Sequence, residues 1–89
     1  MILADAEITY VMGIKGEETC PGSSKAIYDE KECEIASSFV GLNYDRARND
    51  GQSDSICFYK RSESSTRVAN NLGDNASWIC KMSMHSISL

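Results

Sequence analysis

Residues 29–42 read Asp-Glu-Lys-Glu-Cys-Glu-Ile-Ala-Ser-Ser-Phe-Val-Gly-Leu and contain the signals of one complete helix. Asp29 is a residue type that caps helix N-termini, and Glu32, three positions later, completes the pattern of a capping box. Gly41 suits the left-handed residue that ends a helix, and Leu42 can pack back on the last turn. We therefore predict a helix over residues 30–40. Its buried face would carry Cys33, Ala36, Phe39 and Val40.

Strand patterns lie on both sides of this helix. Apolar residues alternate over residues 8–14, and again over residues 78–84, which give the best strand signal in the chain. Residues 55–60 and 66–69 are short β-prone runs, whereas residues 45–55 hold almost nothing apolar and predict a long, mobile loop. The order strand, helix, strands predicts an α+β fold in which one helix packs on a small antiparallel sheet.

Four cysteines occur in a chain of 89 residues: Cys20, Cys33, Cys57 and Cys80. A domain this small buries a limited core, so cross-links are expected, and an even cysteine count predicts two disulfides in an oxidising compartment. A zinc site would need ligands two to four residues apart, but 12, 23 and 22 residues separate these cysteines. Free buried thiols in a cytosolic protein are the remaining alternative.

Four cysteines allow three pairings, and the sequence alone does not choose among them. The predicted elements favour one of the three. Cys33 lies in the first helical turn and Cys57 in a central strand, so a bridge from helix to sheet is plausible. Cys20 would then join the loop before the helix to Cys80 in the last strand. These bridges would stabilise the domain by amounts comparable to its whole net stability.

Candidate catalytic chemistry is sparse. His85 is the single histidine, and no partner for it stands at the spacing of a metal site or a catalytic pair. Glu30 and Glu34 lie one helical turn apart, but no apolar residues enclose them to shift a pKa. We predict no catalytic or cofactor-binding residues and no enzyme activity.

The polar loop offers a weak calcium pattern. Asp45, Asp50 and Asp54 surround Gly51, but they lack the alternate spacing and terminal glutamate of a calcium loop. We therefore predict no metal site.

Two further patterns concern the surface and the core. Asn75-Ala76-Ser77 is an acceptor pattern for N-glycosylation, which mildly favours a secretory route. Aromatic residues that lie near cysteines in strands are expected mainly in the core, although they could also form a ligand surface; they are Tyr44, Phe58, Tyr59 and Trp78.

The formal net charge of −4 disfavours a nucleic-acid partner, because phosphate binding needs a basic surface. No run of 18 or more apolar residues exists, so we expect no transmembrane segment. Residues 1–5 lack the basic and long apolar regions of a signal peptide. If the cysteines are oxidised, we therefore expect that an export sequence was removed or omitted.

The stretch from Cys20 to Lys81 resembles a small four-cysteine module recurrent in dinoflagellate and other algal proteins. The resemblance rests on the order and spacing of five elements: the loop cysteine followed by Ile27, the helix with Gly41-Leu42, Cys57-Phe-Tyr, the segment 67–71, and Ile79-Cys80-Lys81. It implies a non-catalytic, disulfide-bonded module that serves as an accessory piece of larger assemblies, including peripheral lumenal subunits of algal photosystems. Residues 67–70 depart from the aromatic-rich strand expected there, which puts any shared ligand surface in doubt.

These observations predict three parts: a strand-like docking segment over residues 1–19, a disulfide-linked α+β domain over residues 20–84, and a tail over residues 85–89. We expect a structural or protein-interaction module of an oxidising compartment, with the thylakoid lumen and a photosynthetic complex as its suspected setting. A secreted ligand-binding or inhibitor domain is the alternative.

Overall fold

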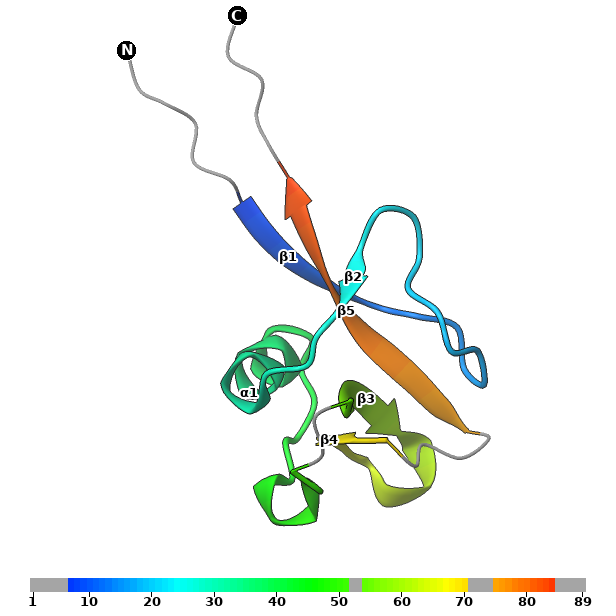
Figure 1. Cartoon of the computed structure of the whole chain (residues 1–89), viewed down its shortest axis with the longest axis vertical. Coiled ribbons are helices and arrows are strands. Elements are labelled where there is room, and N and C mark those ends of the chain that lie inside the picture. The colour runs from blue at the N-terminus through cyan, green and yellow to red at the C-terminus, as the bar shows by residue number, and fades with distance from the viewer. Residues whose placement is uncertain (1–6, 52–53, 71–74, 85–89) are drawn as a thin grey trace, which may run out of the picture.

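The computed structural model describes residues 7–51, 54–70 and 75–84. A five-stranded antiparallel sheet is the centre of the fold, in the order β1-β5-β3-β4, with the short β2 also paired to β5. One helix, α1, packs on this sheet (Figure 1). The elements are β1 (Glu7–Met12), β2 (Lys25–Ala26), α1 (Glu30–Phe39), β3 (Ile56–Lys60), β4 (Ser65–Ala69) and β5 (Ala76–Met84), with single 3₁₀ turns at Arg46–Arg48 and Arg61–Glu63. The predicted α+β class is confirmed.

Strand β5 is the longest strand and connects the rest of the sheet. Along one edge it pairs with β1, from Met12 opposite Ile79 to Glu7 opposite Met84. Along its other edge it pairs with β3 near its start and with β2 at Cys80 and Lys81. The β1–β5 pair therefore extends away from the part of the molecule that holds α1, β3 and β4 (Figure 1).

The helix begins and ends where the sequence predicts. The Asp29 side chain caps α1 by accepting a hydrogen bond from the Glu32 N–H at 2.7 Å. Beyond the last turn Gly41 takes a positive φ of 78°, and the amides of Gly41 and Leu42 donate to the carbonyls of Ser38 and Ser37. This is the Schellman pattern, which satisfies carbonyls that the helix leaves unpaired.

Two details of the helix differ from the prediction. The Glu32 carboxylate does not complete a capping box. It pairs with Lys81 of β5 instead, because an ammonium group offers a charge-assisted hydrogen bond. Phe39 is 57% exposed instead of buried, and its ring meets the edge of Tyr10 with centroids 5.4 Å apart. Tyr10 lies on the outermost strand, so little of the sheet extends beyond it to cover Phe39.

The core lies between α1 and one sheet face, where Cys33 and Ala36 pack with Cys57, Val68 and Ile79. Ser37, which the sequence did not single out, is also fully buried in α1. Its hydroxyl lies 2.5 Å from that of Thr66, which donates to the Asn43 carbonyl, so the buried polar atoms satisfy one another.

The polar loop is tied down, contrary to the predicted mobility, over residues 45–51 and 54–55. The amides of Asp45 and Asp50 donate to the carbonyls of Thr66 and Val68 in β4. In return, the Val68 amide donates to the Asn49 side chain at 2.8 Å. Because its own side chains and amides bond to β4, this polar segment covers the outer edge of that strand.

Part of the strand-like segment predicted over residues 1–19 forms a strand of the sheet. Residues 7–12 form β1 within the sheet of the main domain, and Tyr10 is 9% exposed. Residues 1–6 and the predicted tail over residues 85–89 lie outside the described residues. No helix in the described part of the chain is long and apolar enough to cross a membrane.

Candidate functional site

All four cysteines form disulfides, in the pairing that the predicted elements favoured. Cys33 in α1 bonds to Cys57 in β3, and both residues are fully buried. Cys20, which is partly exposed in the loop before β2, bonds to the buried Cys80 of β5. The first bridge joins the helix to the sheet. The second bridge holds the loop against the face of β5 that points away from α1. The cysteines act as cross-links between elements.

The loop carboxylates bond to neighbouring side chains and amides, and Asp50 and Asp54 both accept hydrogen bonds from Asn70. Asp45 pairs with Arg48 at 3.2 Å, whereas Asp50 accepts hydrogen bonds from Ser55 and from the Asn70 amide. Within residues 7–51, 54–70 and 75–84, no three acidic, histidine or cysteine side chains gather as a metal site would require.

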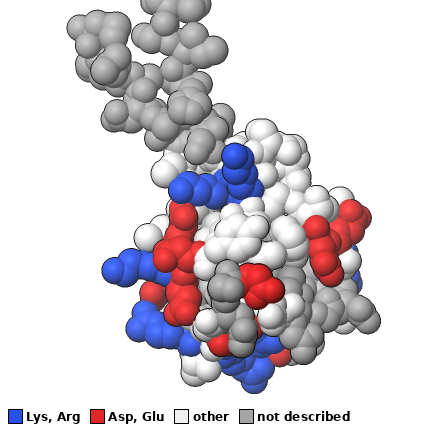
Figure 2. Space-filling model, in the orientation of Figure 1, with Lys and Arg blue, Asp and Glu red and all other residues white. Residues whose placement is uncertain are grey.

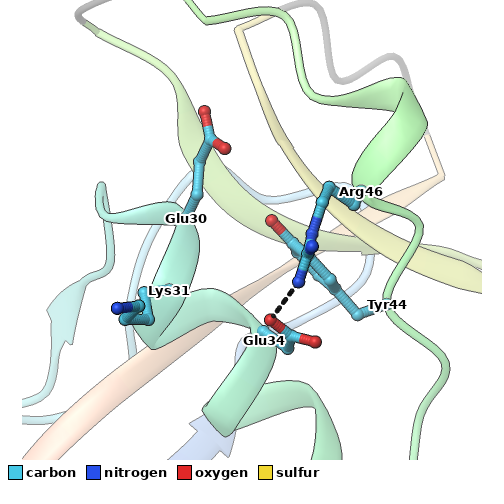
Figure 3. Close-up of a pocket in the computed structure, with 5 residues that line it drawn as sticks. All are labelled: Glu30, Lys31, Glu34, Tyr44 and Arg46. Atoms are coloured by element: carbon cyan, nitrogen blue, oxygen red, sulfur yellow. Dashed lines mark hydrogen bonds and ion pairs between the residues drawn. The ribbon is translucent and has the colours of Figure 1, made fainter.

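A shallow depression of about 340 Å³ lies beside α1 (Figure 3). Arg46 reaches across it to Glu34, with Nη2 and Oε1 2.8 Å apart, and Asn49 donates to Glu30 at 3.1 Å. Burial raises the pKa of Tyr44, although the hydrogen bond from Asn49 acts in the opposite direction. Glu30 and Glu34 thus have partners from the polar loop. The lining residues are Glu30, Lys31, Glu34, Tyr44 and Arg46.

A second polar cluster joins the helix to the β1–β5 pair. Glu32 accepts a hydrogen bond from the Tyr10 hydroxyl at 3.1 Å and pairs with Lys81 at 2.9 Å. Burial is the main cause that raises the pKa of Tyr10, and the hydrogen bond and charge of Glu32 raise it further. The hydrogen bond to Glu32 likewise raises the pKa of Lys81. This cluster fixes α1 against the β1–β5 pair.

The aromatic residues pack mainly as core. Phe58 is fully buried, with the Arg67 guanidinium 5.2 Å from its ring centroid, and Trp78 packs beside it. Tyr59 and Tyr44 are partly buried against the core that lies between α1 and the sheet. The arrangement therefore favours packing over a shared ligand surface for these residues.

The predicted glycosylation residue, Asn75, is exposed immediately before β5, whereas Ser77 of the same tripeptide is buried. His85 lies outside the described residues. Charged side chains of both signs lie interspersed over the face shown in Figure 2, with uncharged surface between them. That face thus has no continuous basic surface of the kind that nucleic-acid binding requires.

The two outer edges of the sheet differ in what covers them. The edge of β4 is covered by the polar loop, as described above. Along the edge of β1 that faces away from β5, no other described strand is paired. This edge carries neither proline nor a charged residue between Ile8 and Ile14, although such residues commonly protect exposed strands.

Exposed apolar side chains accompany the open edge. Ile8 is 46% exposed and Met12 44%, both on the sheet face that carries Tyr10 and α1. Ile14, just beyond the end of β1, is 62% exposed, and Phe39 contacts Tyr10 from the helix. Ile35 lies one helical turn before Phe39, so both are on the same side of α1. We call these residues, with the outward main-chain groups of β1, the β1 edge surface: Ile8, Met12, Ile14, Ile35 and Phe39.

Sequence reasoning found part of this surface. The alternation over residues 8–14 marked a segment that could dock onto a partner, but the contribution of the helix was missed because Phe39 was assigned to the core. Comparison with protein-family models, curated protein sequences and solved structures gives no match. The functional argument therefore rests on the fold and its surfaces.

Proposed function

We propose that this chain is a non-catalytic protein-interaction module of an oxidising compartment, and that it binds a protein partner through the β1 edge surface. The observation that carries the proposal is the difference between the two sheet edges. The chain uses a whole polar loop to cover the edge of β4, yet the edge of β1 is apolar and has no described strand beside it. An edge of this kind is a template for strand addition by another chain.

The main-chain geometry supports strand addition. The Gly13 amide donates to the Trp78 carbonyl of β5 at 2.8 Å, so Gly13 faces β5. Hydrogen-bonding direction alternates along an antiparallel strand, and Thr9 and Val11 therefore also face β5. Tyr10 and Met12 must then direct their N–H and C=O groups outward, where an added strand can bond to them.

The two disulfides support the oxidising compartment. They close loops with sequence separations of 24 and 60 residues, and such cross-links persist in secreted and lumenal proteins while cytosolic reductants remove them. Intact mass before and after reduction tests this in native material. A gain of about 4 Da is expected, because each reduced disulfide takes up two hydrogens; no gain would contradict the compartment.

The finer proposal is an accessory subunit of a photosynthetic membrane complex in the thylakoid lumen, and it is supported by the sequence resemblance alone. The test is native electrophoresis of the solubilised membranes of the source, followed by mass spectrometry of each complex. Co-migration with a photosystem that survives a salt wash is expected. Recovery only as a free small protein would contradict this setting.

Partner binding at the β1 edge surface is tested by site-specific photo-cross-linking in the native source. A photo-reactive residue in place of Met12 should cross-link to one discrete partner. The same residue in place of Ser62, which is exposed in the Arg61–Glu63 turn, is the matched control and should not. Equal cross-linking from both positions, or from Ser62 alone, would place the partner elsewhere.

The secreted alternative is favoured by one observation, the exposure of Asn75. Secretion of the full chain from a eukaryotic host should then add a glycan that Asn75→Gln removes. A secreted chain of unmodified mass would remove the support for this alternative.

A further inference from the structure

We infer that the partner of the β1 edge surface is a second copy of this chain, which pairs its own β1 antiparallel to the first. This inference rests on the proposed function, because it names the partner of the surface proposed there. Both surfaces of a two-fold interface are the same patch, so the patch must be complementary to itself.

The apolar pattern of β1 has that property. Residues 8–14 read Ile-Thr-Tyr-Val-Met-Gly-Ile, with large apolar side chains placed symmetrically about Val11. Antiparallel pairing centred on Val11 sets Tyr10 opposite the second copy's Met12, and it brings Ile8 near the second copy's Ile14, which lies two residues beyond the end of β1. Tyr10 and Met12 are the residues whose main-chain groups face outward, so the same register also forms the backbone hydrogen bonds.

Steric access is compatible with this pairing. A Cβ atom on Gly13 would lie 2.6 Å from the Thr19 carbonyl oxygen, so the loop after β1 covers the sheet face on which Gly13 would carry a side chain. Successive side chains of a strand point to opposite faces. Ile8, Met12 and Ile14 therefore lie on the other face, with α1, and the loop that Cys20 ties to β5 does not cover them.

The exposed area fits a second copy. The five side chains of the surface are 44–62% exposed. With about 200 Å² for each large side chain when fully exposed, they present on the order of 500 Å² of apolar surface per copy. The strand backbone adds further area, and the total area then approaches the roughly 800 Å² per partner of a stable interface.

Charge also permits self-association. Residues 8–14 contain no charged side chain, so the paired strands bring no like charges opposite one another. Each whole chain carries a net charge of −4, and two copies therefore repel weakly at longer range. Added salt should strengthen the dimer by screening that repulsion.

The test is analytical ultracentrifugation of the full oxidised chain over a wide concentration range. The mass should rise from the 9.8 kDa of one chain to twice that value. Met12→Pro removes an outward N–H without breaking a β5 hydrogen bond and should hold the mass at one chain at every concentration. Met12→Ala keeps the N–H and should weaken the dimer by only about 10- to 100-fold, from the lost apolar area. Circular dichroism and intact mass verify folding and both disulfides in each variant.

Amide hydrogen exchange gives an independent readout that needs no variant. The amides of Tyr10 and Met12 should become protected as concentration rises, whereas those of Thr9 and Val11 should be protected throughout. A wild-type chain that stays monomeric at millimolar concentration overturns the inference, as does a dimer whose Tyr10 and Met12 amides exchange freely. If the monomeric chain still cross-links to another protein from Met12, the proposed function stands and only the second copy is wrong.

Discussion

Removal of the Cys33–Cys57 bridge is expected to destabilise this domain as much as removal of the longer Cys20–Cys80 bridge. Its loop has a sequence separation of 24 residues, against 60 for Cys20–Cys80. The chain-entropy model values these loops at about 3.5 and about 4.3 kcal/mol, so loop length alone ranks the second bridge higher.

Burial offsets that difference, because both cysteines of the first bridge are fully buried, whereas Cys20 of the second bridge is partly exposed. Cys33 and Cys57 are both fully buried, so their replacement by alanine also leaves a cavity between α1 and β3, which costs about 1–2 kcal/mol more. The total is about 5 kcal/mol, compared with a net stability of about 4–13 kcal/mol for a domain of 89 residues. Cys33→Ala with Cys57→Ala should therefore lose a large part of the stability of the domain.

The assay is urea unfolding followed by circular dichroism, with the Cys20→Ala and Cys80→Ala pair as the matched control. Each pair is replaced together so that no free thiol remains to form a wrong disulfide. Cys80 is also fully buried, so we expect the control pair to lose about 4.3 kcal/mol through its loop and about 0.5–1 kcal/mol through a smaller cavity, which is about 5 kcal/mol in all. A loss of about 3.5 kcal/mol or less for the Cys33 and Cys57 pair would refute the contribution from burial.

Three smaller perturbations test individual contacts. Asp29→Ala should cost about 1 kcal/mol through loss of the helix cap, while Asp29→Asn, which keeps an acceptor oxygen, should cost less in the same urea titration. Gly13→Ala should cost about 1–3 kcal/mol, seen as a lower melting temperature, because its Cβ would lie 2.6 Å from the Thr19 carbonyl oxygen; an unchanged melting temperature would contradict this contact. The raised pKa of Tyr10 means that the unfolded phenol ionises first, so stability is complete below about pH 10 and falls as pH rises through the folded pKa. Glu32→Gln should lower the pKa of Tyr10 in a phenolate absorbance titration, and an unchanged value would remove Glu32 as a cause.

The features that sequence reasoning predicted correctly are those with local signals. The cap at Asp29 and the positive φ at Gly41 are set by contacts within a few residues, so the helix ends appear in the sequence itself. The disulfide pairing followed from placing each cysteine in an element. Contacts between elements were missed, because nothing near Glu32 in the sequence indicates that Lys81 will lie beside it.

The polar loop shows why composition misleads. Residues 45–55 lack apolar side chains, and this predicted mobility, yet Asn49 and Asp50 replace apolar packing with hydrogen bonds to the backbone of β4 and Asn70. A polar segment becomes ordered in this way only if a strand edge is available to it. The sequence of the loop does not contain that information, because the edge is formed by residues 65–69.

The same reasoning applies to the opposite edge of the sheet. Alternation over residues 8–14 predicts a strand with one apolar face, but whether its outer side is covered depends on where that strand lies in the sheet. Tyr10 is covered by α1, whereas Ile8 and Met12 on the same face remain nearly half exposed. Since the chain pairs the edge of β4 with its own loop, the apolar edge of β1 is the place where another chain can supply the missing strand. For that reason we propose that this domain acts through an edge of its sheet and not through a pocket.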